Sequence, residues 1–130
     1  MMKKILTILL LLPLLGVAQA HLGINEYEIK IQHTDVAFES GTTEKGTRFI
    51  SGDMQLGTFY YYFNSSGVSY TNIQIPYTMV NVNAQAEIYN KKYVIVTDHS
   101  WKAYVENGGV IYINLDYYEE QKLWMFSYTD

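Results

Sequence analysis

Residues 54–63 read MQLGTFYYYF, and their large side chains fall on both faces of an extended chain. Successive side chains of a β-strand point to opposite faces, so the aromatic residues at 59, 61 and 63 would share one face. Tyr60 and Tyr62 would share the other face. The stretch therefore predicts a strand with apolar or amphipathic side chains on both sides.

The turn sequence NSSG at 64–67 follows this strand, and a second extended stretch covers residues 68–75. Pro76 would end that stretch, because proline has no N–H to donate to a strand ladder. The two stretches predict a β-hairpin. A further hairpin turn is predicted at Glu106-Asn107-Gly108-Gly109, since Asn-Gly readily adopts the positive φ values of tight turns.

The chain after residue 20 keeps this two-residue rhythm and is interrupted about every ten residues by Gly, Asn, Ser or Asp. No segment of about ten residues shows a convincing amphipathic helical pattern. We therefore expect an all-β fold, a small antiparallel barrel or sandwich of about eight to ten strands in a meander-like order. The remaining expected strands are 27–31, 33–38 (as its continuation or as a separate strand), 48–50, 78–82, 84–89, 93–98, 101–105, 110–118 and 123–128, with turns at 51–53, 90–92 and 119–122.

The first twenty residues have the pattern of an export signal. Two lysines precede an apolar stretch over 5–15, and Ala18 and Ala20 match the small residues of a cleavage site. Such a stretch is too short to span a membrane, which needs about twenty residues. We expect a cleaved signal peptide over 1–20 and a single all-β domain over 21–130, exported to the periplasm or the extracellular medium without a membrane span.

Charge and cysteine content exclude several classes of partner and of functional site. The chain has nine Lys and Arg and thirteen Asp and Glu. Removal of Lys3 and Lys4 with the signal leaves a net charge of 7 − 13 = −6 on residues 21–130. This acidity argues against nucleic acid as a partner. The absence of cysteine excludes disulfide scaffolds, thiolate metal sites and thiol nucleophiles.

The aromatic content is unusually high, with thirteen tyrosines, five phenylalanines and two tryptophans. Tyrosine suits a strand with one wet face, because its ring packs while its hydroxyl reaches water, and this explains many of them. Rings on an outer face would instead form a platform that stacks on a sugar, anchors a protein partner or pairs with a second copy as a homo-oligomer. The candidate ligand-binding residues are Tyr60, Tyr62, Trp124, Phe126 and Tyr128.

A metal site is an alternative that the histidines suggest. His21 would become the amino terminus after signal cleavage, and its α-amine and imidazole nitrogens would suit copper(II). His99 or His33 would complete the site, with Asp98 or Asp35 nearby. The candidate metal ligands are therefore His21 and His99, and copper is the candidate cofactor.

No catalytic motif occurs at a recognisable spacing. Asp98-His99-Ser100 contains the residue types of a hydrolase triad, but adjacent residues cannot form its chain of contacts. Glu119 and Glu120 would point to opposite faces of an extended segment and cannot flank one bond. We therefore expect a non-catalytic binding or interaction protein with an aromatic sheet surface. The alternatives are an envelope copper binder, a self-associating structural subunit, and an enzyme or enzyme inhibitor with a dispersed site.

Overall fold

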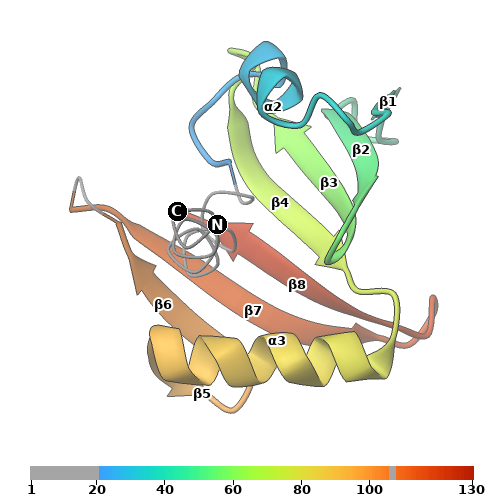
Figure 1. Ribbon diagram of the computed structural model, residues 1–130. Helices are drawn as coiled ribbons and strands as arrows, with labels where there is room; N and C mark the ends of the chain where they lie inside the picture. Colours follow the sequence, from blue (N-terminus) through green and yellow to red (C-terminus); the bar gives the residue numbers. More distant parts are fainter. Residues whose placement is uncertain (1–20, 106–107) are drawn as a thin grey trace, which may run out of the picture.

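The computed structural model describes residues 21–105 and 108–130 (Figure 1). The predicted signal peptide, and Glu106 and Asn107 of the predicted Asn-Gly turn, lie outside the described residues. The helices are α2 (Glu26–Gln32) and α3 (Met79–Lys92), and the strands are β1 (Glu39–Thr42), β2 (Arg48–Met54), β3 (Gly57–Phe63), β4 (Ser69–Ile75), β5 (Val94–Thr97), β6 (Ser100–Tyr104), β7 (Val110–Tyr118) and β8 (Leu123–Thr129).

These strands form one antiparallel sheet with the order β1-β2-β3-β4-β8-β7-β6-β5. Each half is a four-stranded meander. Helix α3 carries the chain from the end of β4 to the far edge of the second half, so β8 returns to pair with β4. The predicted antiparallel, mostly β fold is confirmed. Among the described residues β1 and β5 are edge strands, so the sheet is not closed.

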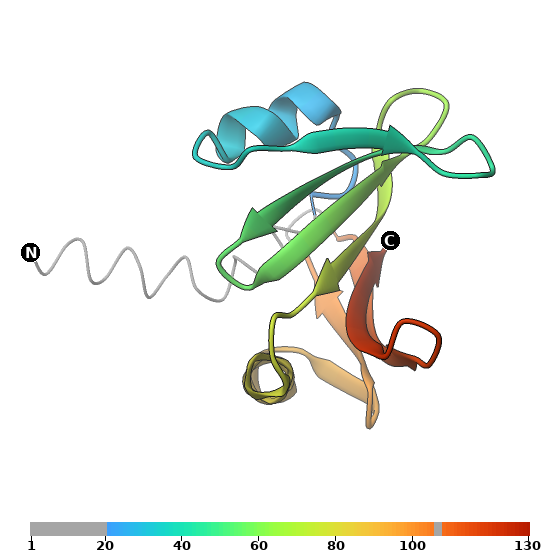
Figure 2. The same cartoon turned by 90° about the vertical axis from the view of Figure 1, so that its right-hand side faces the viewer.

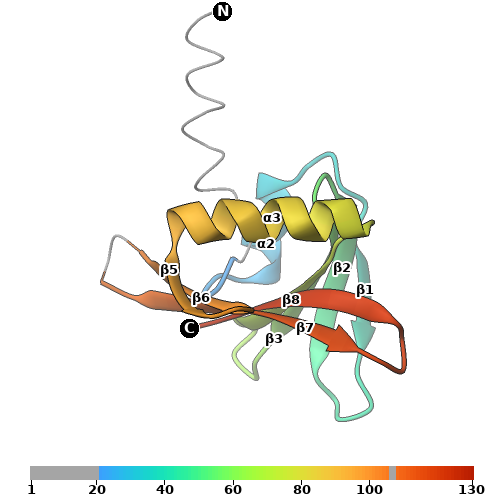
Figure 3. The same ribbon diagram turned by 90° about the horizontal axis from the view of Figure 1, so that it is seen from below.

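The two helices cover different parts of the sheet. Helix α3 lies across the half formed by β5 to β8, whereas α2 lies at the far end against β2 and β3 (Figures 1 and 2). Seen from below, α3 runs in the same general direction as β7 and β8 (Figure 3). An apolar cluster lies under each helix. The α3 cluster is built around Val82, Tyr89, Trp101, Ile113 and Phe126. The α2 cluster is built around Ile29, Ile50, Phe59, Tyr61 and Phe63.

Residues 27–31 belong to helix α2, so the predicted strand there is wrong. Asn25 caps the helix by accepting a hydrogen bond from the Glu28 N–H, and the Glu28 carboxylate accepts one from the Asn25 N–H. This reciprocal capping box fixes the start of the helix. Only Ile29 of the helix is buried, and the alternating pattern that indicated a strand has no sheet partner. Residues 33–38 also form no strand.

Helix α3 replaces the two strands that were predicted at 78–82 and 84–89, and those predictions are wrong. Its valines and three asparagines have low helix propensity, which hid the helix in the sequence. Packing against the sheet overrides that preference. The buried side chains recur at spacings of three and four residues, as one face of a helix requires: Val82, Gln85 and Tyr89.

The predicted turn at 51–53 is part of strand β2, which continues to Met54 and turns at Gln55 and Leu56. Gly52 suggested the turn, but its role is close packing. A Cβ at this position would lie 2.6 Å from Val36 Cγ1. Glycine inside a strand often marks such a close approach rather than a turn.

A buried hydrogen-bond network joins α3 to the seam between the two sheet halves. Gln85 of α3 and Gln74 of β4 bond to each other through both amide groups. The Tyr128 hydroxyl on β8 donates to Gln74 Oε1 at 2.6 Å, and the Tyr89 hydroxyl lies 2.8 Å from that of Tyr128. Burial raises the pKa of both tyrosines. Because buried polar groups need partners, this network specifies how α3 sits across the seam.

Candidate functional site

The outer face of the sheet, opposite the α2 cluster, carries aromatic side chains on β2 and β3. The Phe49 ring centroid lies 5.9 Å from that of Tyr60 and 5.7 Å from that of Tyr62. All three residues are partly exposed, while the intervening residues of β3 are buried. Tyr60 and Tyr62 therefore lie on the more exposed face of β3. Their role in binding stays a prediction.

Two further tyrosines extend this patch, Tyr70 on β4 and Tyr118 at the end of β7. Burial raises the pKa of Tyr62, and electrostatic interactions with Tyr60, Tyr70 and Tyr118 raise it further. The phenol groups of Tyr60, Tyr70 and Tyr118 therefore lie within electrostatic range of Tyr62, although the four residues come from three different strands. We call Phe49, Tyr60, Tyr62, Tyr70 and Tyr118 the tyrosine surface.

A groove of about 900 Å³ adjoins the tyrosine surface between the start of α2, the β1–β2 loop and the β3–β4 turn. Tyr27 and Tyr70 contribute rings to it and are 72% and 42% exposed. Amide and hydroxyl side chains supply much of the remaining lining: Asn25, Thr47, Asn64, Ser65 and Ser66. The groove therefore combines accessible aromatic rings with uncharged hydrogen-bonding groups.

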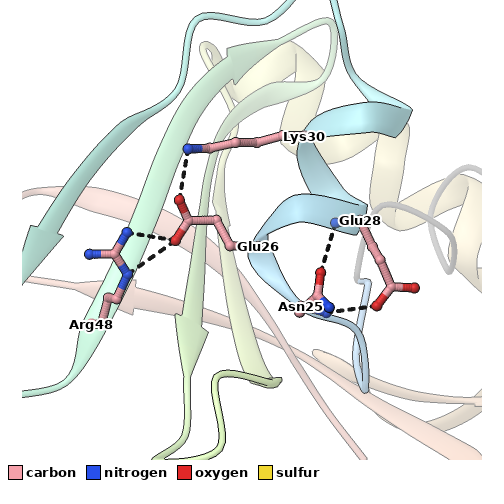
Figure 4. A network of polar contacts seen from close by, with 5 residues as sticks. All are labelled: Asn25, Glu26, Glu28, Lys30 and Arg48. Atoms are coloured by element: carbon pink, nitrogen blue, oxygen red, sulfur yellow. Dashed lines mark hydrogen bonds and ion pairs between the residues drawn. The ribbon is translucent and has the colours of Figure 1, made fainter.

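Two of the charged side chains that line this groove, Glu26 and Arg48, form an ion-paired network with Lys30 (Figure 4). Lys45 also lines the groove. The Glu26 carboxylate accepts hydrogen bonds from Lys30 Nζ and from Arg48 Nη2, each at 2.7 Å. Burial alone would raise the pKa of Glu26, but the hydrogen bonds from Lys30 and Arg48 outweigh it and hold the pKa below its usual value. Glu26 therefore stays ionised and holds Arg48 of β2 against the start of α2.

A second groove, of about 510 Å³, adjoins the first. Tyr62, Ile73 and residues of the β1–β2 loop line it together with Tyr70. Lys45, Thr47 and Tyr70 line both grooves, so the two adjoin at these residues. The tyrosine surface and the two grooves thus form one contact region centred on Tyr70.

The other predicted aromatic platform does not face outward. Phe126 and Tyr128 are 0% and 1% exposed, and Trp124 is partly buried against the same apolar cluster. The prediction of exposed rings is wrong for Phe126 and Tyr128. The physical reason is that this face of β8 lies under α3, where the Tyr89 ring packs 5.6 Å from that of Phe126.

The histidines separate into a pair and a single residue. His21 Nε2 lies 2.8 Å from His33 Nε2, whereas the His99 ring packs 5.9 Å from Trp124. The structure thus brings His21 to His33, and no contact joins it to His99 among the described residues. Within 21–105 and 108–130, no group of three or more His, Cys, Asp or Glu side chains is arranged to hold a metal ion. Copper binding by His21 stays a prediction.

Sequence reasoning does not assign Tyr27, Tyr70 or the loop at 43–47 to a binding site. The capping-box pattern of Asn25 and Glu28 is the signal that would have revealed α2, and with it the exposure of Tyr27. Tyr70 lies at an irregularity in the pairing of β3 with β4, because Phe63 pairs with Ser69 and Tyr62 pairs with Thr71. A β-bulge re-aims side chains locally, and no pattern in the sequence marks it.

No family model, no curated protein and no solved structure matches this chain. Neither helix in the described part of the chain is long and apolar enough to cross a membrane. The geometry around Tyr70 is therefore the basis for a functional assignment.

Proposed function

We propose that this is an exported, non-catalytic binding protein whose tyrosine surface and adjoining grooves bind a neutral oligosaccharide. The observation that carries the proposal is the position of Tyr70. It belongs to the tyrosine surface and lines both grooves, so a ligand that follows the grooves must pass its ring. Export rests on the signal-like pattern of the first twenty residues.

Sugar chemistry fits the side chains of this region. Aromatic rings offer flat apolar faces to the C–H faces of a pyranose, while amide and hydroxyl groups pair with sugar hydroxyls. The first groove supplies both kinds of group through Tyr27, Tyr70 and its uncharged polar lining. Two grooves that adjoin at one ring suit an elongated ligand better than a single small molecule.

Charge favours a neutral ligand. The region after residue 20 has a formal charge of 7 − 13 = −6, which disfavours polyanionic glycans by repulsion. Glu26 and Arg48 are already paired with each other at the first groove. The other charged lining residues, Glu44 and Lys45, contribute one charge of each sign.

Binding to neutral hexasaccharides of glucose, mannose and N-acetylglucosamine tests the proposal. We expect Tyr70→Ala to lower the affinity for the bound sugar at least tenfold, about 1.4 kcal/mol, because the central stacking ring is lost. Tyr70→Phe keeps the ring and should retain most of the affinity. Tyr104→Ala is the matched control, since Tyr104 is an exposed tyrosine on β6 that lines neither groove.

Two results would reject the assignment. One is the absence of binding to all three sugar classes by a correctly folded protein. The other is equal affinity for Tyr70→Ala and Tyr104→Ala, which would mean that the ligand does not contact the Tyr70 region.

A second candidate function, self-association, is favoured by the β5 edge. Val94, Ile95 and Val96 are 49%, 56% and 51% exposed, and β5 has a paired neighbour on one side alone within the described sheet. Edge strands of monomers are usually protected by being short, charged, bulged or covered. Strand β5 has four residues and an irregular pairing with β6 between Ile95 and Thr97, but it carries no charged side chain or proline. The opposite edge follows that rule, because β1 has the polar sequence ESGT.

The charges that flank β5 are complementary to those of a second copy. If two β5 strands pair antiparallel about Ile95, Val94 of one copy faces Val96 of the other. The same register brings Lys92 towards Asp98 of the other copy. Antiparallel self-pairing would therefore satisfy the free backbone groups, cover the apolar side chains and oppose unlike charges.

Sedimentation over a wide concentration range tests this second function. We expect the wild-type protein to dimerise and Ile95→Lys to be monomeric, because a charge would be placed at the centre of the interface. Ile31→Lys is the matched control, since Ile31 is 52% exposed on α2, in the other half of the molecule. A strictly monomeric wild type, or a dimer that Ile95→Lys leaves intact, would rule the β5 interface out.

A further inference from the structure

The side chains of His21 and His33 contact each other and so join the two ends of the segment that contains helix α2. Their Nε2 atoms are 2.8 Å apart, and the rings meet edge to face with centroids separated by 5.0 Å. The two residues are twelve positions apart and flank helix α2. At this distance one Nε2–H donates to the other Nε2, and both nitrogens are close enough to reach a single metal ion.

The fold holds both histidines in place independently of this contact. After His21, the backbone is tied to β4 by hydrogen bonds from the Gly23 N–H to the Ser69 carbonyl and from the Ser69 N–H to the Ile24 carbonyl. His33 is the C-cap of α2, and its N–H donates to the Lys30 carbonyl. The two donor atoms therefore converge because two anchored segments bring them together.

The surroundings keep both imidazoles neutral. The Tyr61 ring lies 5.8 Å from His21, and the Phe38 ring lies 6.4 Å from His33. Burial, and then the proximity of His33, lower the pKa of His21 to about 4. Burial also lowers the pKa of His33, against an opposing effect of the Asp35 carboxylate. Burial thus favours the neutral imidazole, which is the form that ligates metals.

We propose that His21 and His33 form a binding site for a late first-row divalent metal ion, held by both Nε2 atoms. Zinc–nitrogen bonds of about 2.0–2.1 Å at a tetrahedral angle would place the two nitrogens about 3.4 Å apart, so the pair needs to open by only about 0.6 Å. Water completes the coordination. Affinity should be higher for copper(II) than for zinc(II), as is general for nitrogen ligands.

This site differs from chelation by a free amino terminus. An α-amine chelates together with the Nδ1 atom of its own imidazole, whereas the atom that faces His33 is Nε2 of His21. Metal binding by the pair therefore does not need a free α-amine on His21. An amino-terminal extension ahead of His21 separates the two possibilities.

Calorimetric titration of the exported protein with zinc(II) alone tests the proposal. We expect one zinc ion per chain, and at least a tenfold loss of affinity for His21→Ala and for His33→Ala. His99→Ala is the matched control and should bind as the wild type does. His33→Gln can keep a hydrogen bond to His21 but lacks the imidazole ligand, so it should stay folded and still lose zinc.

An extended protein with residues ahead of His21 should bind zinc as tightly as the processed one. The proposal is overturned if the wild type binds no zinc, if folded His33→Gln binds it unchanged, or if the extension abolishes binding. In the last case the terminal amine, rather than the histidine pair, is the ligand. None of these outcomes depends on oligosaccharide binding, so this proposal and the proposed function stand or fall separately.

Discussion

Gly57 begins β3 in a conformation that a side chain would disturb. Its φ is +144°, and a Cβ would lie 2.4 Å from the Ile75 carbonyl oxygen of the neighbouring strand. We expect Gly57→Ala to lower the free energy of unfolding by about 3 kcal/mol, because backbone strain and a backbone clash add. Urea unfolding measures it.

Gly67→Ala is the control that measures the cost of backbone strain without a steric clash. Gly67 has a φ of +78° in the β3–β4 turn, and no atom lies within 4 Å of a Cβ placed there. Gly67→Ala should therefore lower the free energy of unfolding by about 1 kcal/mol. Equal losses for the two variants would show that the close approach of Ile75 does not constrain Gly57.

The histidine pair predicts acid sensitivity. The pKa of His21 falls from 6.5 to about 4 on folding, and that of His33 is also lowered. Below pH 6.5 these two imidazoles therefore bind protons more readily in the unfolded chain than in the folded one. The free energy of unfolding should fall as the pH drops from about 6.5 towards 4, by on the order of 2 kcal/mol for His21.

Urea midpoints at pH 7.5 and 4.5 check this expectation. The fall should be smaller for His21→Gln and for His33→Gln, since each removes one of the buried imidazoles. His99→Ala should keep the wild-type fall. An undiminished fall in both glutamine variants would place the acid sensitivity elsewhere in the chain.

At the scale of the element, Gln85 decides how α3 packs. Its Nε2 has three acceptors within 3.0 Å, namely Gln74 Oε1 and the Tyr89 and Tyr128 hydroxyls. We expect Gln85→Ala to lower the free energy of unfolding by about 2 kcal/mol, because buried polar partners are left unsatisfied. Asn83→Ala, at an exposed position of the same helix, should be neutral or slightly stabilising. Similar urea midpoints for the two variants would contradict a structural role for the network.

Gln85 also explains why the apolar pattern does not reveal α3. The alternation that marks β3, β7 and β8 is strong because each buries one apolar face, and their positions are close to those expected. In α3 a polar glutamine occupies a core position, so the helical face does not look apolar. In α2 only Ile29 is buried, and a single contact leaves no helical period to detect.

At the scale of the whole molecule, strand order depends on contacts that are distant in the sequence. The hairpins are local, and turn residues such as Asn64 and Gly67 predict one of them. The pairing of β4 with β8 joins Thr71 to Thr129, and nothing between them marks that partnership. For the same reason Tyr60 and Tyr62 could be placed on an outer face, whereas Tyr118 could not be placed beside them.

We expect the region around Tyr70 to be where this protein binds its ligand. Backbone amide chemical shifts, recorded during titration with the neutral hexasaccharide that binds, test it without any mutation. We predict that the shifts concentrate in the β1–β2 loop at 43–47 and around Tyr62 and Tyr70. Shifts confined to α3 and β5, or shifts spread evenly over the molecule, would contradict it.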